Sequence, residues 1–281
     1  MPLPITPDQE VYVRQRLYMA GRQAQSLGVA GFQVDEKGPG DFVTTVDRAL
    51  DAYLAEQFRA IFPGEALVTE EDAASRAIYA EEAGRLWCID PIDGTDDFIH
   101  GRPHYALMVG LLENYVPQAG WVYAPVLDRF YFGGPGWGLY LAQGGRVTEL
   151  KPQRPDVAAL ALAIGYKDRK RFGAALVESL PGVDFTSLGS FGLKVLEVVQ
   201  GRAAAYVYLN RRVKVWDTAG PIALAQAAGL VCCDLEGRSL GFRPEDVDLT
   251  SLAHRQTILI GWPDSVEHLR HQISAAVASV V

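Results

Sequence analysis

The spacing of apolar residues predicts two helices near the start of the chain. Thr6 and Gln9 can form a capping box around a helix that begins at Pro7, and its pattern continues to about residue 28. Apolar residues then recur at helical spacing over residues 46–62, where a Pro-Gly pair ends the pattern. We therefore expect the chain to open with two helices.

From residue 66 onward, short apolar runs bounded by turns replace the helical period. In the first half, strands are predicted over 66–68, 86–89, 105–112, 119–123, 129–132 and 138–142. After a candidate seam at 151–155, strands are predicted near 203–208, 230–234 and 257–260, and helices near 168–180, 190–200, 217–228 and 263–280. The fold class is therefore mixed, with an α+β N-terminal half of residues 1–150 and an α/β C-terminal half of residues 151–281.

Composition excludes several classes of partner. With 281 residues, 49% of them apolar, the chain can form one large domain or two small ones. The formal charge of −8 argues against a nucleic-acid polymer as partner, which would need a basic face. No apolar run approaches the roughly 18 residues of a membrane span, and no signal-peptide pattern is present. Without such a run, no membrane is expected as a partner. Three cysteines without disulfide or metal spacing predict buried thiols in a reducing compartment, so a cytoplasmic protein is expected.

The densest chemical signal is the run WCIDPIDGTDDF at residues 87–98, where an apolar strand ends in carboxylates. The proline after Asp90 has no N–H group, so the chain must turn there. Such a turn can direct the Asp90 and Asp93 carboxylates and the Ile92 carbonyl toward one point. Oxygen ligands of this kind suit Mg²⁺. The sequence therefore predicts a magnesium site at this strand end.

Other polar residues are candidates for the same site. Gly94 and Thr95 open a short helical turn, whose N–H groups can bind phosphate. Glu70 follows a predicted strand, and Asp217 follows an apolar run at the predicted N-cap of the next helix. Each of these acids, and Asp47 in the first turn of its helix, is alone equally typical of an ordinary cap or surface charge. Three acidic strand ends in one chain favour a shared site.

These motifs resemble the inositol monophosphatase family in their order and spacing. The resemblance spans most of the chain and rests on GDFVTTVD (40–47), VTEED (68–72), WCIDPIDGTDDFIHGRP (87–103) and VWDTAG (215–220). It implies an α-β-α-β-α layered sandwich and a lithium-sensitive, magnesium-dependent phosphatase that acts on a small phosphate ester. Many members of the family are homodimers, so a homodimer is expected here.

The resemblance also implies a set of metal ligands. Glu70, Asp90 and the Ile92 carbonyl would hold one Mg²⁺, and Asp90, Asp93 and Asp217 would hold a second. Glu70 would hold a third, looser ion through water, which gives two or three ions for each site. Metal ions of this kind offset the charge of a phosphate dianion and activate water, so no covalent nucleophile is needed.

The catalytic roles likewise come from the resemblance. Thr95, with Glu70 and Asp47 nearby, would orient the attacking water, and the N–H groups of Gly94 and Thr95 would hold the phosphate. Other mechanisms lack their residues, because Pro91 stands where a haloacid-dehalogenase-type phosphatase has its nucleophile, and no nucleophile elbow or Walker A motif is present. A catalytically silent metal-binding or phosphate-binding regulator remains an alternative of another class.

The expected substrate is inositol monophosphate or a similar polyol or sugar phosphate. In inositol-specific relatives, an acid seven positions before Asp217 contacts a substrate hydroxyl, but here that position is Asn210. Arg212 and Lys214 follow, on one face if this segment is a strand, and Lys194 on the preceding helix could join them. They form either an exposed strand edge or a wall for a second anionic group. The second case favours a 3′(2′),5′-bisphosphate nucleotidase that acts on 3′-phosphoadenosine 5′-phosphate.

Overall fold

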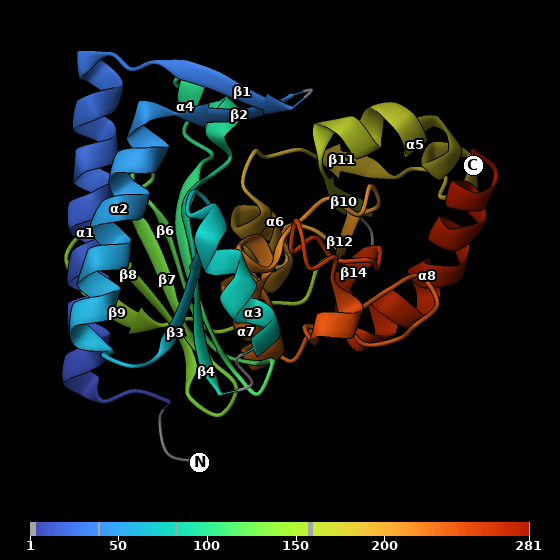
Figure 1. Ribbon diagram of the computed structural model, residues 1–281. Helices are drawn as coiled ribbons and strands as arrows, with labels where there is room; N and C mark the ends of the chain where they lie inside the picture. The colour runs from blue at the N-terminus through green and yellow to red at the C-terminus, as the bar shows by residue number, and fades with distance from the viewer. Residues whose placement is uncertain (1–3, 39, 82–83, 157–159, 281) are drawn as a thin grey trace.

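The computed structural model describes residues 4–38, 40–81, 84–156 and 160–280 as a sandwich of alternating helical and sheet layers (Figure 1). On the outer face of a large sheet lie α1 (Pro7–Ala30) and α2 (Thr45–Ile61), joined by a hairpin of β1 (Val34–Gly38) and β2 (Asp41–Thr44). Between the two sheets lie α6 (Phe191–Val199) and α7 (Val215–Ala227), and the outer layer beyond the second sheet is α5 (Tyr166–Ser179) and α8 (Pro263–Ala278). The expected α-β-α-β-α sandwich is confirmed.

The larger sheet has seven strands in sequence order. They are β3 (Ala66–Thr69), β4 (Arg85–Asp93), β5 (Ala106–Glu113), β6 (Val116–Ala124), β7 (Arg129–Gly134), β8 (Gly138–Gln143) and β9 (Arg146–Glu149). Only β3 and β4 pair in parallel; the other neighbours are antiparallel. Short helical segments flank β4: η1 (Ala73–Ala77) and α3 (Ile78–Glu81) before it, and α4 (Thr95–Ile99) after it.

The smaller sheet has five strands in the order β11-β10-β12-β14-β13. Their bounds are β10 (Ala161–Ile164), β11 (Asp184–Thr186), β12 (Ala205–Tyr208), β13 (Val231–Cys233) and β14 (Ile258–Gly261), and η2 (Pro244–Asp246) lies in the connection before β14. The larger sheet ends at Glu149, and the division of the chain at residue 150 stays a prediction. Across the described residues, no helix combines the length and apolarity needed to cross a membrane.

Most predicted elements are present. Strands β1 and β9 were not predicted, because their exposed, largely polar residues show no alternating pattern, and β2, which pairs with β1, was missed as well. Strands β10 and β11, of four and three residues, were also not predicted, although the equally short β3 and β13 were. The segment with Arg212 and Lys214, which was considered as a strand, is a loop, since β12 ends at Tyr208 close to the predicted end of its strand.

Helix α7 lies against the large sheet through glycines. A Cβ added at Gly120 of β6 would lie 2.1 Å from the Gly220 carbonyl oxygen of α7, and one added at Gly110 of β5 would lie 2.4 Å from the Gly220 nitrogen. These contacts are with backbone atoms, which cannot move aside as a flexible side chain can. The sheet and α7 therefore approach more closely than any other residue would allow.

Gly120→Ala is accordingly expected to lower the free energy of unfolding by about 2 kcal/mol or more, as overpacking of a rigid contact does. Gly28→Ala is the matched control, because its added Cβ would make ordinary contacts with Phe98 at 3.4 Å inside a helix. That control should change stability by no more than about 1 kcal/mol, in the stabilising direction. Urea denaturation of both variants measures this difference, and equal stabilities would contradict the packing.

Candidate active site

A cavity of about 250 Å³ opens where the two halves of the chain meet. One side is acidic and carries the predicted metal ligands. The opposite side comes from the C-terminal half and carries basic and polar side chains. Its lining includes Gly40, Asp41, Glu70, Asp90, Ile92, Asp93, Gly94, Thr95, Lys167, Tyr208, Asn210, Arg212, Lys214 and Asp217.

The parallel pairing of β3 and β4 brings Glu70 and Asp90 together. Thr69 lies opposite Ile89, and the Glu70 N–H donates to the Ile89 carbonyl at 3.1 Å. Glu70 and Asp90, the next residues of the two strands, therefore lie side by side at the same edge of the sheet. The register of β4 against β5 then shifts between Asp90 and Asp93. This irregularity, at the position of the proline, lets the Asp90 carboxylate turn back and accept from the Ile92 N–H at 2.9 Å.

The turn after Asp93 also fixes Thr95. Gly94 has φ of +94°, a left-handed conformation that suits glycine, and α4 begins at the next residue. The Thr95 hydroxyl lies 3.0 Å from the Ile92 carbonyl oxygen and 3.2 Å from Asp47 Oδ1. Asp47 is fully buried, and its other carboxylate oxygen accepts from the Thr44 N–H at 2.9 Å and from the Thr44 hydroxyl. Asp47, Ile92 and Thr95 thus form one rigid cluster.

Asp217 enters the cavity from the start of α7. It was predicted as the N-cap, but the helix begins two residues earlier, at Val215, and Lys214 occupies the N-cap position. Asp217 Oδ2 accepts from the Lys214 N–H at 2.7 Å, as the third residue of a helix can do. This bond, and not a cap of its own, orients the carboxylate.

The carboxylates raise one another's proton affinity. Burial, followed by the negative charges of Glu70, Asp93 and Asp217, holds the pKa of Asp90 well above its usual range. Burial likewise raises the pKa of Asp217 to about 7, and Lys214 opposes the shift. The pKa of Asp47 is raised to about 6, again mainly by burial. Burial, together with the neighbouring carboxylates, therefore makes it costly for these acids to carry their charges without a balancing cation.

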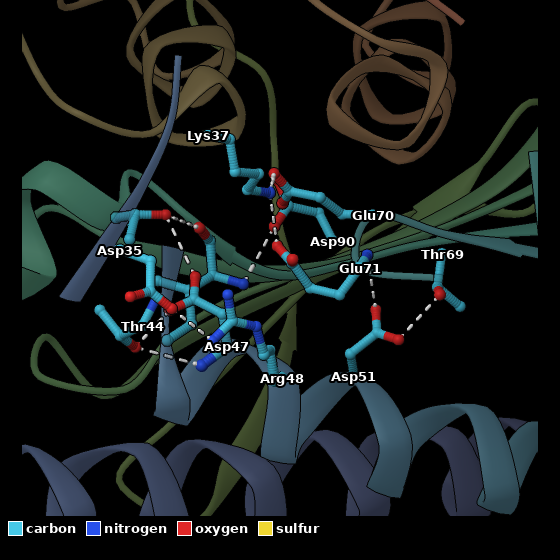
Figure 2. Close-up of polar contacts among 12 residues, drawn as sticks. Asp35, Lys37, Thr44, Asp47, Arg48, Asp51, Thr69, Glu70, Glu71 and Asp90 are labelled. Atoms are coloured by element: carbon cyan, nitrogen blue, oxygen red, sulfur yellow. Dashed lines mark hydrogen bonds and ion pairs between the residues drawn. The ribbon is translucent and has the colours of Figure 1, made fainter. Parts of the chain in front are cut away.

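Lys37 and Glu71 also belong to this region, although the sequence analysis did not select them. Lys37 of β1 reaches Glu70 Oε1 at 3.0 Å and Glu71 Oε1 at 2.7 Å (Figure 2). Although burial works to lower it, these two carboxylates raise the pKa of Lys37, and burial raises the pKa of Glu71 to about 7. Asp51 of α2 supports the same segment, accepting from the Thr69 hydroxyl at 2.8 Å.

The donor set fits a hard cation. Among the described residues, no three His, Cys, Asp or Glu side chains are already gathered as they would be around a bound metal ion. Their oxygens instead accept from protein donors, as Glu70 does from Lys37 and Asp217 from Lys214. Even so, the four carboxylates predicted as ligands and Ile92 all line one cavity, and carboxylate and carbonyl oxygens are the ligands that Mg²⁺ prefers.

On the opposite wall, the structure brings together three of the residues predicted to contact substrate. Asn210, Arg212 and Lys214 all line the cavity, as does Lys167 of α5, which was not predicted. Asn210 Oδ1 accepts from the Arg212 N–H at 3.1 Å, so this amide also shapes its own loop. Lys167 Nζ donates to the Gly40 carbonyl at 2.8 Å, which joins α5 to the β1–β2 turn.

Lys194 lies elsewhere, contrary to the prediction that it adds to this wall. Its side chain is 4% exposed, and its ammonium group donates to the carbonyls of Leu188, Gly189 and Ser190, each at 2.9 Å. All three of its protons are therefore engaged behind the cavity, and burial lowers the pKa of Lys194 to about 8.

Comparison with known proteins identifies a family. The model of the inositol monophosphatase family matches residues 13–262. Inositol-1-monophosphatase of Bacillus subtilis (strain 168) is 31% identical over 215 residues, 74% of this chain and 77% of that protein. The 3′(2′),5′-bisphosphate nucleotidase CysQ of Salmonella typhimurium is 29% identical over 205 residues, 73% of this chain and 80% of that protein.

Solved structures share the fold. An IMPase/NADP phosphatase complexed with Mg²⁺ and phosphate is similar with a TM-score of 0.78 at 18% identity, covering 94% of this chain and 94% of that chain. At this identity the similarity establishes the layered architecture alone. The two sequence relatives named above differ in the substrate that their names give, which leaves the substrate of this chain to be argued from its own cavity.

Proposed function

The chain belongs to the inositol monophosphatase family, and from that premise we propose that it is a Mg²⁺-dependent phosphatase. The reaction is hydrolysis of a small phosphate monoester by an activated water, with inositol monophosphate or a similar polyol or sugar phosphate as substrate. The observation that carries the proposal is the convergence of Glu70, Asp90, Asp93 and Asp217 with Thr95 on one cavity.

The ligand roles follow the predicted set. Glu70, Asp90 and the Ile92 carbonyl would hold one Mg²⁺, Asp90, Asp93 and Asp217 would hold a second, and Glu70 would hold a looser third through water. When bound, the ions offset the charge of the phosphate dianion and lower the pKa of water. The gathering of Glu70, Asp90, Asp93 and Asp217 along one cavity supports this assignment, because carboxylate oxygens are the ligands that Mg²⁺ prefers.

The chain's own residues position the water and the phosphate. The Thr95 hydroxyl donates its one proton to the Ile92 carbonyl or to Asp47, so its lone pairs can accept a hydrogen bond from the attacking water. As the water passes a proton to this oxygen, the Thr95 proton moves to the Asp47 carboxylate. Asp47 and Glu70 hold the water's other side. The N–H groups of Gly94 and Thr95, at the left-handed turn, orient the phosphate.

A second candidate substrate is a bisphosphate such as 3′-phosphoadenosine 5′-phosphate. The observation that favours it is the presence of Arg212 and Lys214 together on the cavity wall. Arginine suits bidentate contact with phosphate. Asn210 offers no charged acceptor for an inositol hydroxyl. A phosphate-release screen with Mg²⁺ over inositol phosphates, sugar phosphates and this bisphosphate tests the proposal, and release from none of them would contradict it.

The double variant Arg212→Met/Lys214→Met tests the bisphosphate candidate. It is expected to raise KM for the bisphosphate about tenfold or more, because charge-assisted hydrogen bonds contribute about 1.5–3 kcal/mol each. KM for a monophosphate should change much less. Arg211→Met is the matched control, since this neighbouring exposed residue is not part of the cavity lining. Equal changes in KM for both substrates would show that Arg212 and Lys214 do not bind a second phosphate, and would favour the polyol phosphate as substrate.

Three further properties belong to the same proposal. Lithium inhibition and a homodimer are expected from the family resemblance, and a cytoplasmic location agrees with three cysteines that are all free and buried. Light scattering and activity with and without Li⁺ measure the first two. The alternative of a catalytically silent regulator predicts Mg²⁺ or phosphate binding without release of phosphate from any ester, and the presence of Thr95 with every predicted ligand favours the enzyme.

A further inference from the structure

Lys194 is a buried lysine that the proposed mechanism does not use. It lies in the first turn of α6, where the helix dipole disfavours a cation, and its three hydrogen-bond partners are all backbone carbonyls. Burying a charge is costly unless hydrogen bonds satisfy it. A residue kept in such a position is expected to serve something beyond the packing of its own helix.

The carbonyls that bind Lys194 belong to the loop that holds Asp93. The Ser190 hydroxyl and the Gly192 N–H, the latter at 3.0 Å, both donate to Asp93 Oδ2. The Gly189 N–H donates to Asp97 Oδ2 at 2.9 Å, which ties the other side of this loop to α4. The loop therefore connects both ends of the turn that carries the metal ligand and Thr95.

We infer that Lys194 is a positioning residue for the metal centre. Its ammonium group gathers the carbonyls of Leu188, Gly189 and Ser190, and this fixes the Ser190 hydroxyl and the Gly192 amide against the Asp93 carboxylate. Lys194 touches neither substrate nor metal and acts through the loop alone. The inference rests on the proposed function only in taking Asp93 as a Mg²⁺ ligand.

The main rival explanation is that Lys194 acts only through its positive charge, which partly neutralises the carboxylates of the metal centre. Its charge lies near the carboxylates, since it lowers the pKa of Asp93 against the upward effect of burial. The two roles predict opposite results when that charge is removed. Loss of a positive charge alone makes the cluster more negative and tightens Mg²⁺ binding, whereas loss of positioning weakens it.

Lys194→Met removes both the charge and the donors while keeping a side chain of similar length. Calorimetric titration with Mg²⁺ alone is expected to show about tenfold weaker binding, the size of effect usual for residues that orient metal ligands. Ser190→Ala, which leaves Lys194 and its carbonyls intact, should also weaken binding. Lys170→Met, at an exposed lysine of α5, is the control and should bind Mg²⁺ as the wild type does.

Amide hydrogen exchange gives a readout that needs neither metal nor substrate. In metal-free Lys194→Met, the Gly192 amide is expected to exchange at least about tenfold faster, because its partner carboxylate is no longer held. Should this variant not fold, Lys194→Gln, which keeps two donors, allows the same comparison with a smaller change. Mg²⁺ binding as tight as or tighter than wild type, or an unchanged Gly192 amide, would overturn the inference. Wild-type protein that binds no Mg²⁺ would instead contradict the proposed function.

Discussion

Excess EDTA is expected to abolish phosphate release, by about a thousandfold or more, because metal ions stabilise the charge of this reaction by several kcal/mol and each 1.4 kcal/mol is a factor of ten. Without them, the substrate phosphate would meet Asp90 and Asp217 with their charges unbalanced. Adding Mg²⁺ beyond the chelator should restore the rate.

The control is the fold itself, followed by circular dichroism in the same EDTA solution. The layers and cores are built from apolar side chains, so the protein should stay folded while it loses activity. Full activity in excess EDTA would rule out the metal-dependent mechanism. Loss of the fold together with the activity would show that the carboxylates need a cation for stability as well.

Thr95→Ala is expected to slow turnover about a hundredfold or more, the usual contribution of a group that takes part in proton transfer in the transition state. Mg²⁺ binding should be nearly unchanged, because the hydroxyl contacts Ile92 and Asp47 and is not assigned as a ligand. Asp93→Asn and Asp217→Asn, in contrast, should lower both metal affinity and rate.

Thr95→Ser provides the matched control. It keeps the hydroxyl at the same position and should recover most of the turnover, which separates the role of the oxygen from that of the methyl group. The measurements are kcat at saturating Mg²⁺ and the Mg²⁺ concentration for half-maximal rate. Wild-type turnover in Thr95→Ala would show that the assigned role is wrong.

Much of the predicted site is encoded locally, while Glu70 and Asp217 lie far from that segment and were placed in the site by their strand-end positions and by the family resemblance. Asp90, Ile92, Asp93 and Thr95 lie within one strand end and its turn, where the proline and a glycine dictate the backbone path. The layered fold was likewise predictable, because its motifs resemble a known family and most strands carry clear apolar runs. At the end of β4, the residues that supply the candidate ligands also determine the path of the backbone that positions them.

The remaining parts depend on contacts between distant segments. Lys37 reaches Glu70 from a hairpin whose polar residues show no strand pattern, and Lys167 meets Gly40 across the cavity. Lys194 resembles any surface lysine in sequence, and only the path of residues 188–190 shows that it is buried. Asp217 was placed at the N-cap because an acid after an apolar run is typical of one, whereas its bond to Lys214 makes it the third helical residue.

The loop that holds Asp93 has a consequence for how the protein is made. Ser190 and Asp93 are separated by 97 residues in the chain, and Asp217 comes later still. A nascent chain on the ribosome therefore exposes Glu70, Asp90 and Asp93 well before the segments that orient and complete them have been synthesised. Closing so long a loop is slow relative to local folding. The metal centre can therefore form only after the segments with Ser190 and Asp217 have been synthesised and have docked, and metal binding should favour that docking.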